Sequence, residues 1–487
     1  MLLFPSRMRS AFLVLAVLAT LGAQESDMAE RLFRSGERAY AAKSYPEALE
    51  TWGQLLQQAP TSGFAAQALL RMANHQLEQE HKPEAALPLL ERVKTEHMKT
   101  PWAADAMLLR GQILATQARK PQDLRDAVGE FNRVVDLFPD HPALQTARYH
   151  LGLAAKLQGQ WARALQHFTD AIRLDPTSPV APKAQFQAAE VLDVMGDLSG
   201  CLRLLQGLRN QFPQSPEASE AAWRIAQRVK FRIQKPPLRS EGPWPQGKTK
   251  WLKTPTLLST NANGEIVIYQ DDLDQAFVLR GTELTAIGPV CKSAKALALL
   301  PDGTPCLLSA KTGISTAANL PPIPVAGLSN PSGLFQDAWQ NFWVSDAKAA
   351  ALSVVEPTGT LRSLPSPATS AMAALPNGGA VVASDANRSL LFLDASAQPR
   401  LTVPYGKDLP APFKYVVALS ADPTGHVVAL VDGDFEGVVL WGPNGSLLRF
   451  ATFKELGLNG KFRAVTLDRQ GGIILADRSN DLLIRLN

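Results

Sequence analysis

Residues 152–176, GLAAKLQGQWARALQHFTDAIRLDP, decide the fold of the first half of this chain. Small residues stand at Gly152 and Ala164, an aromatic ring follows at Phe168, and Pro176 ends the pattern. Small side chains let two helices approach, the ring fills the space beside them, and proline cannot continue a helical hydrogen-bond ladder. The stretch therefore predicts two packed helices joined by a short turn.

The same pattern recurs over residues 27–233. Equivalent places are occupied, at spacings of 37, 42, 37 and 37 residues, by Ala48, Ala85, Ala127, Ala164 and Cys201. Other units repeat the small, aromatic and proline positions at Gly36, Trp52, Pro60, Gly111, Phe131 and Pro139. Repeated units of this length stack because none can bury its apolar face alone. The units resemble tetratricopeptide repeats, and the resemblance implies an α-solenoid that binds a peptide or a partner protein.

From about residue 251 the sequence changes to short apolar strands separated by turns. The pattern is clearest in residues 341–346 (NFWVSD), 379–385 (GAVVASD) and 472–477 (GIILAD). Apolar runs of this length, bounded by turns, are typical of strands that are buried on both faces. Six such units occur, which predicts blades stacked in a ring.

These strand units resemble the NHL type of β-propeller, and Asn330-Pro-Ser-Gly333 matches that motif best. The resemblance implies a six-bladed propeller over residues 251–487. The last unit shows only three strands, so we expect residues near Lys250 to Thr254 to supply its fourth, because an open edge strand invites aggregation. The fold class is therefore a multidomain α plus all-β chain.

Residues 234–250 separate the two halves. Their proline, glycine and charge content predicts a semi-rigid linker. The basic residues in and near this segment are Lys235, Arg239, Lys248, Lys250 and Lys253. Their spacing is typical of a solvated connector, whereas a nucleic-acid site would show a dense basic face with aromatic residues. Nucleic acid is not an expected partner.

Residues 1–23 have the order of a secretory signal. Arg7 and Arg9 precede an apolar run from Ala11 to Leu21, and small residues follow at Gly22 and Ala23. The run is about half the length of a membrane-spanning helix. The residue directly after Ala23 is Gln24 and not cysteine, so the pattern of a lipid-modified protein is missing. We expect a periplasmic or secreted protein with no transmembrane anchor in the mature chain.

The composition is that of an ordinary folded protein. The chain has 487 residues, of which 19% are charged and 46% hydrophobic, with a net charge of +4. This length fits roughly two domains. Three cysteines, Cys201, Cys291 and Cys306, are too few for a disulfide framework. A bridge between Cys291 and Cys306 is one interpretation, although the expected hairpin register opposes it.

The concave face of the solenoid is the candidate binding site. Helix positions that do not pack between repeats are expected to line it, and these are Glu37, Tyr40, Asn74, Gln112, Tyr149, Lys156, Phe186, Glu190 and Asp193. Such a groove would hold an extended or helical segment through side-chain pockets and hydrogen bonds. The same residues could instead be solvated helix surface or contact the strand half. The resemblance to exported envelope proteins with tetratricopeptide repeats implies a scaffold in the bacterial cell envelope.

An enzyme or small-ligand sensor is the alternative. Some propellers of this type carry metal-dependent lyase or lactonase sites in the central channel. The strand half has a single histidine, His426, which excludes a histidine-rich zinc site. Calcium could use the repeated acids Asp271, Asp346, Asp385, Asp432 and Asp477, but we expect each of them to cap backbone donors in a blade turn instead. No phosphate loop, zincin motif or nucleophile elbow occurs, so we expect no catalytic set and no cofactor or metal.

Overall fold

A computed structural model describes residues 26–119, 121–248, 250–261, 263–300, 302–316, 320–337, 339–357, 359–376 and 378–487. The predicted signal, residues 1–23, lies outside the described residues. The chain divides into two compact units, Met1–Ala118 with Gln122–Leu151, and Arg119–Pro121 with Gly152–Asn487. Among the described residues, no helix is both long enough and apolar enough to cross a membrane.

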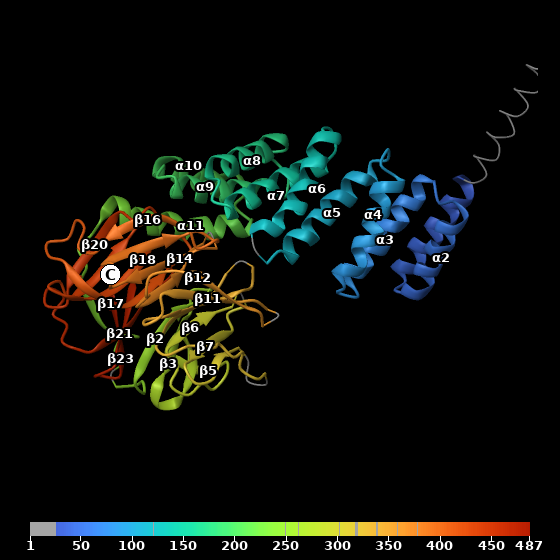
Figure 1. Ribbon diagram of the computed structural model, residues 1–487. Helices are drawn as coiled ribbons and strands as arrows, with labels where there is room; N and C mark the ends of the chain where they lie inside the picture. The colour runs from blue at the N-terminus through green and yellow to red at the C-terminus, as the bar shows by residue number, and fades with distance from the viewer. Residues whose placement is uncertain are drawn as a thin grey trace, which may run out of the picture. The chain divides into compact units, whose positions relative to one another are not determined.

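The first unit is built from helical hairpins (Figure 1). A helix over residues 26–41 precedes α2 (Tyr45–Gln58), α3 (Gly63–Glu78), α4 (Pro83–Glu96), α5 (Trp102–Gln117), η1 (Pro121–Asp123), α6 (Leu124–Leu137) and α7 (Ala143–Leu157). The boundary between the units falls within α7. The second unit continues with α8 (Trp161–Leu174), α9 (Ala181–Val194), α10 (Leu198–Gln211), α11 (Pro216–Arg228) and η2 (Val229–Gln234).

The small residues of the repeats lie where aromatic rings cross them. A Cβ atom at Gly111 would lie 2.5 Å from the Phe131 ring, and a Cβ atom at Gly152 would lie 2.5 Å from the Phe168 ring. Real side chains do not tolerate such contacts, so only glycine lets the paired helices pack at this distance. The predicted pairing of small and aromatic positions is confirmed.

The strands of the second unit form a six-bladed propeller, and the first three blades hold β2 to β12. The first blade holds β2 (Pro255–Thr260), β3 (Ile266–Gln270), β4 (Gln275–Arg280) and β5 (Glu283–Ile287), with the short helix η3 (Asp271–Leu273) between β3 and β4. The second holds β6 (Ala296–Leu299), β7 (Pro305–Ser309) and β8 (Gly313–Ser315) in the described part. The third holds β9 (Pro331–Gln336), β10 (Phe342–Asp346), β11 (Ala351–Val355) and β12 (Leu361–Pro365).

Three further blades complete the ring. The fourth holds β13 (Ala371–Ala374), β14 (Ala380–Ser384), β15 (Ser389–Leu393) and β16 (Pro399–Pro404). The fifth holds β17 (Phe413–Ala421), β18 (Val427–Gly433), β19 (Gly437–Trp441) and β20 (Leu447–Thr452). The sixth holds β21 (Phe462–Leu467), β22 (Ile473–Asp477), β23 (Leu482–Leu486) and β1 (Ser240–Trp244). Each innermost strand contacts the next, and β21 contacts β2, so the ring is closed as predicted.

The strand that completes the sixth blade is not the predicted one. β1 pairs antiparallel with β23, for example Trp244 with Leu483. The prediction that Lys250 to Thr254 form this strand is therefore wrong, and the segment expected to be a linker contains a blade strand. The Thr254 amide instead donates to Asp481 in the turn between β22 and β23, at 2.9 Å. The glycine and proline of β1 are typical of a linker, so the sequence did not predict a strand there. An outermost strand nevertheless tolerates proline, because one of its edges forms no ladder hydrogen bonds.

Some of the repeated acids cap backbone donors, as predicted. Asp346 accepts hydrogen bonds from the amides of Ser329 and Asn330 at 2.7 Å and of Lys348 at 2.8 Å. Asp477 accepts two backbone amides in the same way, and Asp385 accepts one from the neighbouring blade. In the described part of the chain, Asp271 and Asp432 bind no backbone donor through their carboxylates, so the prediction is wrong for these two.

The substitution Asp346→Ala is expected to lower the free energy of unfolding by about 2–3 kcal/mol, because three backbone amides lose a charged acceptor that is itself buried. Burial opposes ionisation of Asp346, but the amides outweigh it and hold its pKa below the ordinary value. A lowered folded-state pKa means that the stabilisation is complete at neutral pH and is lost as the pH falls below about 3.9. Thermal unfolding at pH 7 and pH 3 measures the stability of both proteins. The difference in melting temperature between wild type and Asp346→Ala should be smaller at pH 3.

The exposed Asp432 provides the control for this prediction. Asp432→Ala should change stability by less than about 0.5 kcal/mol at both pH values. A pH-independent loss in Asp346→Ala would show that packing, and not the charged acceptor, stabilises the turn.

All three cysteines are free and buried. Cys201 occupies the small position of its helical repeat, packed against Ala189 and Leu205. Cys306 pairs with Ala298 across β6 and β7, and Cys291 packs in a different cluster beside Tyr269. Burial raises the pKa of the Cys306 thiol to about 12, so it stays protonated at neutral pH. Cys291 and Cys306 thus form no bridge and pack in separate parts of the core.

Candidate binding groove

A groove in the first unit brings two of the predicted residues together. It is a cavity of about 470 Å³, lined by residues from the first helix, α3 and the N-terminal part and middle of α5. The lining residues are Phe33, Gln67, Leu70, Arg71, Asn74, Trp102, Asp105, Leu108, Leu109 and Gln112. We call this the solenoid groove.

The lining of the solenoid groove combines apolar side chains with amides. Leu70, Leu109 and Trp102 offer apolar surface, while Asn74 and Gln112 occupy equivalent positions on successive repeats. A carboxamide can donate and accept, which is what the main chain of a bound peptide requires. Gln112 Nε2 lies 2.9 Å from His150 Nε2, and this contact holds the Gln112 amide in place. The groove can thus pair with peptide main chain and bury an apolar side chain.

Three other predicted residues lie near this groove without lining it. Glu37 forms an ion pair with Arg71 at 2.8 Å, and Arg71 does line the groove. Tyr40 packs against Trp52 and His75, so its ring belongs to the packing of the first hairpins. Tyr149 contacts the His150 ring, edge to face, behind Gln112. Sequence reasoning missed the groove residues Phe33, Arg71 and Trp102, although an aromatic directly after Pro101 at a helix start was a usable signal.

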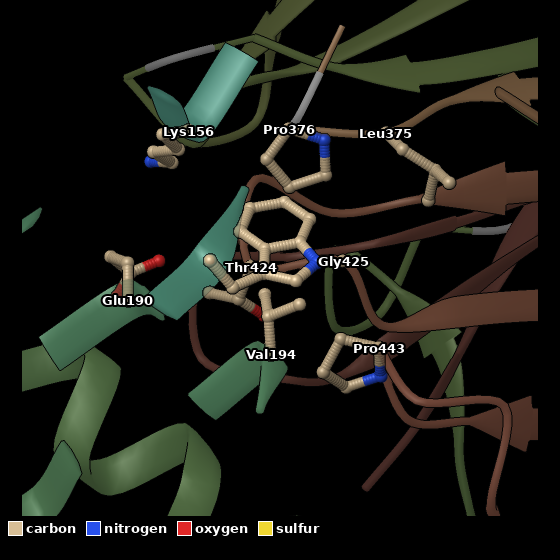
Figure 2. A pocket seen from close by; sticks show the side chains of 9 residues that line it. Lys156, Glu190, Val194, Leu375, Pro376, Thr424, Gly425 and Pro443 are labelled. Atoms are coloured by element: carbon tan, nitrogen blue, oxygen red, sulfur yellow. The ribbon is translucent and has the colours of Figure 1, made fainter. Parts of the chain in front are cut away.

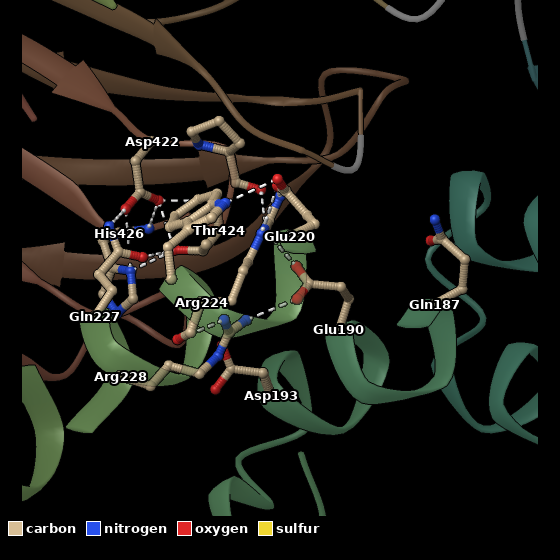
Figure 3. Close-up of polar contacts among 12 residues, drawn as sticks. Gln187, Glu190, Asp193, Glu220, Arg224, Gln227, Arg228, Asp422, Thr424 and His426 are labelled. Carbon is tan, nitrogen blue, oxygen red and sulfur yellow. Dashed lines mark hydrogen bonds and ion pairs between the residues drawn. The ribbon is translucent and has the colours of Figure 1, made fainter. Parts of the chain in front are cut away.

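The remaining predicted residues belong to the second unit, where two of them join a buried ionic network. Arg228 is fully buried and donates to Glu190 and to Asp193, at 2.9 Å in each case (Figure 3). Arg224 donates to the second oxygen of Glu190 at 2.7 Å, and Arg232 pairs with the second oxygen of Asp193. Glu190 and Asp193 are thus engaged by arginines of α11 and η2.

The network continues into the propeller. Arg224 also donates to the carbonyl of Pro423 at 3.2 Å, and Gln227 donates to Asp422 at 2.8 Å (Figure 3). Burial favours the neutral form of Asp422, but the neighbouring histidine and hydroxyl outweigh it and lower its pKa to about 2. Arg469 of the sixth blade pairs with Glu220 of α11 at 2.7 Å. Helix α11 is therefore anchored to the turns of the fifth and sixth blades.

Phe186 and Lys156 have separate roles. The Arg224 guanidinium lies over the Phe186 ring, 5.3 Å from its centre, so Phe186 supports the network from one side. Lys156 lines a cavity of about 50 Å³ together with Trp161, Glu190 and Val194 of the helices (Figure 2). The other walls of this cavity are Leu375, Pro376, Thr424, Gly425 and Pro443 of the propeller.

The central channel of the propeller contains a cavity of about 110 Å³. Its walls come from the innermost strands of all six blades and from the residues that lead into them. Apolar side chains predominate, and the charged residues of the lining are the cations Lys295 and Arg463. The described residues contain no cluster of three or more His, Cys, Asp or Glu side chains that could hold a metal.

Comparison with known protein families agrees with the helical architecture. Tetratricopeptide-repeat family models match residues 70–142, 118–179 and 155–222. Residues 70–222 therefore contain tetratricopeptide repeats, the class of helical repeat that the sequence predicted. Repeats of this class point to protein binding. A comparison with curated proteins finds no match to this chain.

Solved structures resemble each half separately. Virginiamycin B lyase from Staphylococcus aureus is 11% identical, with a TM-score of 0.36, over 51% of this chain and 98% of its own. A gluconolactonase from Xanthomonas campestris is 15% identical, with a TM-score of 0.37, over 49% of this chain and 88% of its own. YrrB, a tetratricopeptide-repeat protein with an unusual peptide-binding site, is 18% identical, with a TM-score of 0.31, over 42% of this chain and 96% of its own.

Proposed function

We propose that this protein is a non-catalytic exported scaffold that binds protein or peptide partners in the bacterial cell envelope. The solenoid groove supplies the main binding surface, and the propeller, which we assign to the NHL type on its Asn330-Pro-Ser-Gly333 motif, presents further faces. The observation that carries the proposal is the groove of about 470 Å³, which is lined by two equivalent amides and by apolar side chains. That combination suits an extended peptide with apolar side chains.

The charge of the propeller channel supports a binding role over calcium-dependent catalysis. Lys295 and Arg463 are exposed cations in the lining of the channel cavity. A divalent cation prefers carboxylate and carbonyl oxygens and is repelled by neighbouring ammonium and guanidinium groups. The distribution of charge in the channel therefore opposes calcium binding there.

The double substitution Asn74→Ala with Gln112→Ala tests the groove. Peptides selected from a random display library on the full-length protein are expected to bind the double variant about 30-fold more weakly. Two lost hydrogen bonds of about 1 kcal/mol each account for this factor. Fluorescence anisotropy of labelled peptides measures the dissociation constants.

The matched control removes amides of the same type outside the groove. Gln57 and Asn132 are exposed on α2 and α6 and do not line the cavity. Gln57→Ala with Asn132→Ala should leave peptide affinity within a factor of two. Equal binding by the groove variant and the wild type would place the peptide site elsewhere and overturn the proposal.

Export is the second part of the proposal and rests on the order of residues 1–23, with Arg7 and Arg9 before the apolar run. N-terminal sequencing of the protein from a bacterial periplasmic fraction is expected to show cleavage after Ala23. A full-length protein confined to the cytoplasm would contradict this part without affecting the groove.

A further inference from the structure

Two adjoining cavities in the second unit form one cleft between helices and blades. The inner cavity, of about 50 Å³, is the one that Lys156 lines, and the outer cavity measures about 380 Å³. Both are lined by Trp161, Val194, Leu375 and Pro443, so they are continuous along these residues. We call the combined space the junction cleft.

The inner end of the junction cleft holds a half-buried lysine that forms no ion pair with a carboxylate of the described residues. Lys156 Nζ donates to Gln187 Oε1 at 2.7 Å. Glu190 lines the same cavity and favours the charged form of Lys156, but its two oxygens bind Arg224 and Arg228. Burial outweighs this effect and lowers the pKa of Lys156, as expected for an ammonium group partly removed from water. A partly desolvated cation with spare donors can bind an anion.

The surrounding charges leave this preference in place. The ionic network behind the inner cavity joins four carboxylates, those of Glu190, Asp193, Glu220 and, through Gln227, Asp422, to four guanidinium groups, those of Arg224, Arg228, Arg232 and Arg469. These charges balance, and Lys156 is a positive charge in addition to them. An anionic group in the inner cavity would be attracted by Lys156.

The rest of the junction cleft is apolar and then polar along its length. Trp161 lines the cleft together with Pro376 and Pro443 of the propeller turns. The outer cavity ends among polar groups, including the ion pair of Arg400 with Asp394 at 2.6 Å and the side chain of Asn444. From the inner end of the cleft outward, a bound ligand would therefore contact a cation, then an apolar wall, and then hydrogen-bonding groups.

We propose that the junction cleft binds the carboxyl terminus of a peptide, with its carboxylate on Lys156 and its apolar last side chain against Trp161 and Leu375. The inner cavity has room for about three waters, which suits a terminal carboxylate but not a continuing chain. The polar groups of the outer cavity suit peptide main chain, whereas a fatty acyl chain would need apolar surface throughout. The site is separate from the solenoid groove and does not depend on its proposed function.

Isothermal titration calorimetry of the full-length protein tests the assignment. The probes are an acetylated tripeptide ending in leucine, as free acid and as carboxamide, and decanoate. The free acid is expected to bind at least tenfold more tightly than the carboxamide. Lys156→Met should remove this preference, while Lys156→Arg should keep the affinity within about threefold. Lys183→Met, at an exposed lysine of α9, is the matched control and should change nothing.

Proton linkage and stability give readouts that a purely structural lysine would not produce. Because a bound carboxylate raises the pKa of Lys156, binding at pH 9 should take up protons, as measured in buffers of different ionisation enthalpy. Lys156→Met should abolish the uptake and leave the melting temperature equal or higher, since it removes a partly desolvated charge that forms no ion pair. Equal binding of acid and carboxamide, no binding of the acid up to 5 mM (roughly −3 kcal/mol), or binding of decanoate alone would each overturn the proposal.

Discussion

We expect the substitution Arg228→Met to lower the free energy of unfolding of the second unit by about 3–5 kcal/mol. Arg228 is fully buried, and its guanidinium satisfies Glu190 and Asp193 at once. Burial opposes the positive charge, but the two carboxylates outweigh that effect and raise the pKa of Arg228. Methionine has a similar length and no donor, so two buried carboxylates would lose a charged partner while the packing volume stays nearly the same.

Urea unfolding followed by circular dichroism measures this loss, and an exposed ion pair provides its control. Arg173 pairs with Asp170 at 3.1 Å, yet its side chain is 80% exposed. Solvent screens such a pair, so Arg173→Met should cost less than about 0.5 kcal/mol. A similar small loss in Arg228→Met would contradict the view that this network stabilises the helical end of the second unit.

The second large effect is expected from Phe231→Ala, which should loosen the attachment of α11 to the propeller. Phe231 lies in η2 and is fully buried among residues of the fifth and sixth blades, including Leu430 and Ile473. Its ring also contacts His426 edge to face, with 5.0 Å between ring centres. Removing a buried phenylalanine ring leaves a cavity and costs about 3–5 kcal/mol. The substitution should therefore weaken the contact between η2 and the blades.

Hydrogen exchange of residues 216–234, followed by mass spectrometry, locates the effect of Phe231→Ala. Exchange in this segment should accelerate more than exchange in the blade strands, because the ring is the apolar part of the attachment. Ile233 in the same short helix is 57% exposed, and Ile233→Ala is the control with less than about 0.5 kcal/mol of change. Unchanged exchange in residues 216–234 would assign the attachment to the polar contacts of Arg224 and Gln227 instead.

The helical half illustrates what local pattern can predict. Spacing alone placed Gly111 against Phe131 and Gly152 against Phe168, because close helix packing demands a small residue opposite a large one. The same spacing identified Asn74 and Gln112 as groove residues, since equivalent positions of successive repeats share a face. It did not distinguish them from Glu190 and Asp193, which share that spacing but lie in a buried ionic network.

The strand half shows where local pattern misleads. The apolar runs predicted six blades because strands buried on both faces must be apolar throughout. They did not reveal that Ser240–Trp244 closes the ring, since an edge strand with alternating exposure and a proline has the local composition of a linker. Sequence reasoning also missed Trp161, whose aromatic side chain at the start of α8 is one of the four residues shared by both parts of the junction cleft.

The sequence by itself determined that this chain holds a tetratricopeptide-repeat array followed by a ring of blades. Each repeat contains the same local pattern of small, aromatic and apolar residues, so the pattern can be recognised without knowledge of the tertiary structure. Only the tertiary structure decided which helix faces stay open and which are covered. Gln227 meets Asp422 across 195 residues, and Arg469 meets Glu220 across 249. Contacts over such separations depend on how completed elements dock, and no spacing within one repeat encodes them. The same docking brings Lys156 and the propeller residues Leu375 and Pro443 to one cavity and so creates the junction cleft.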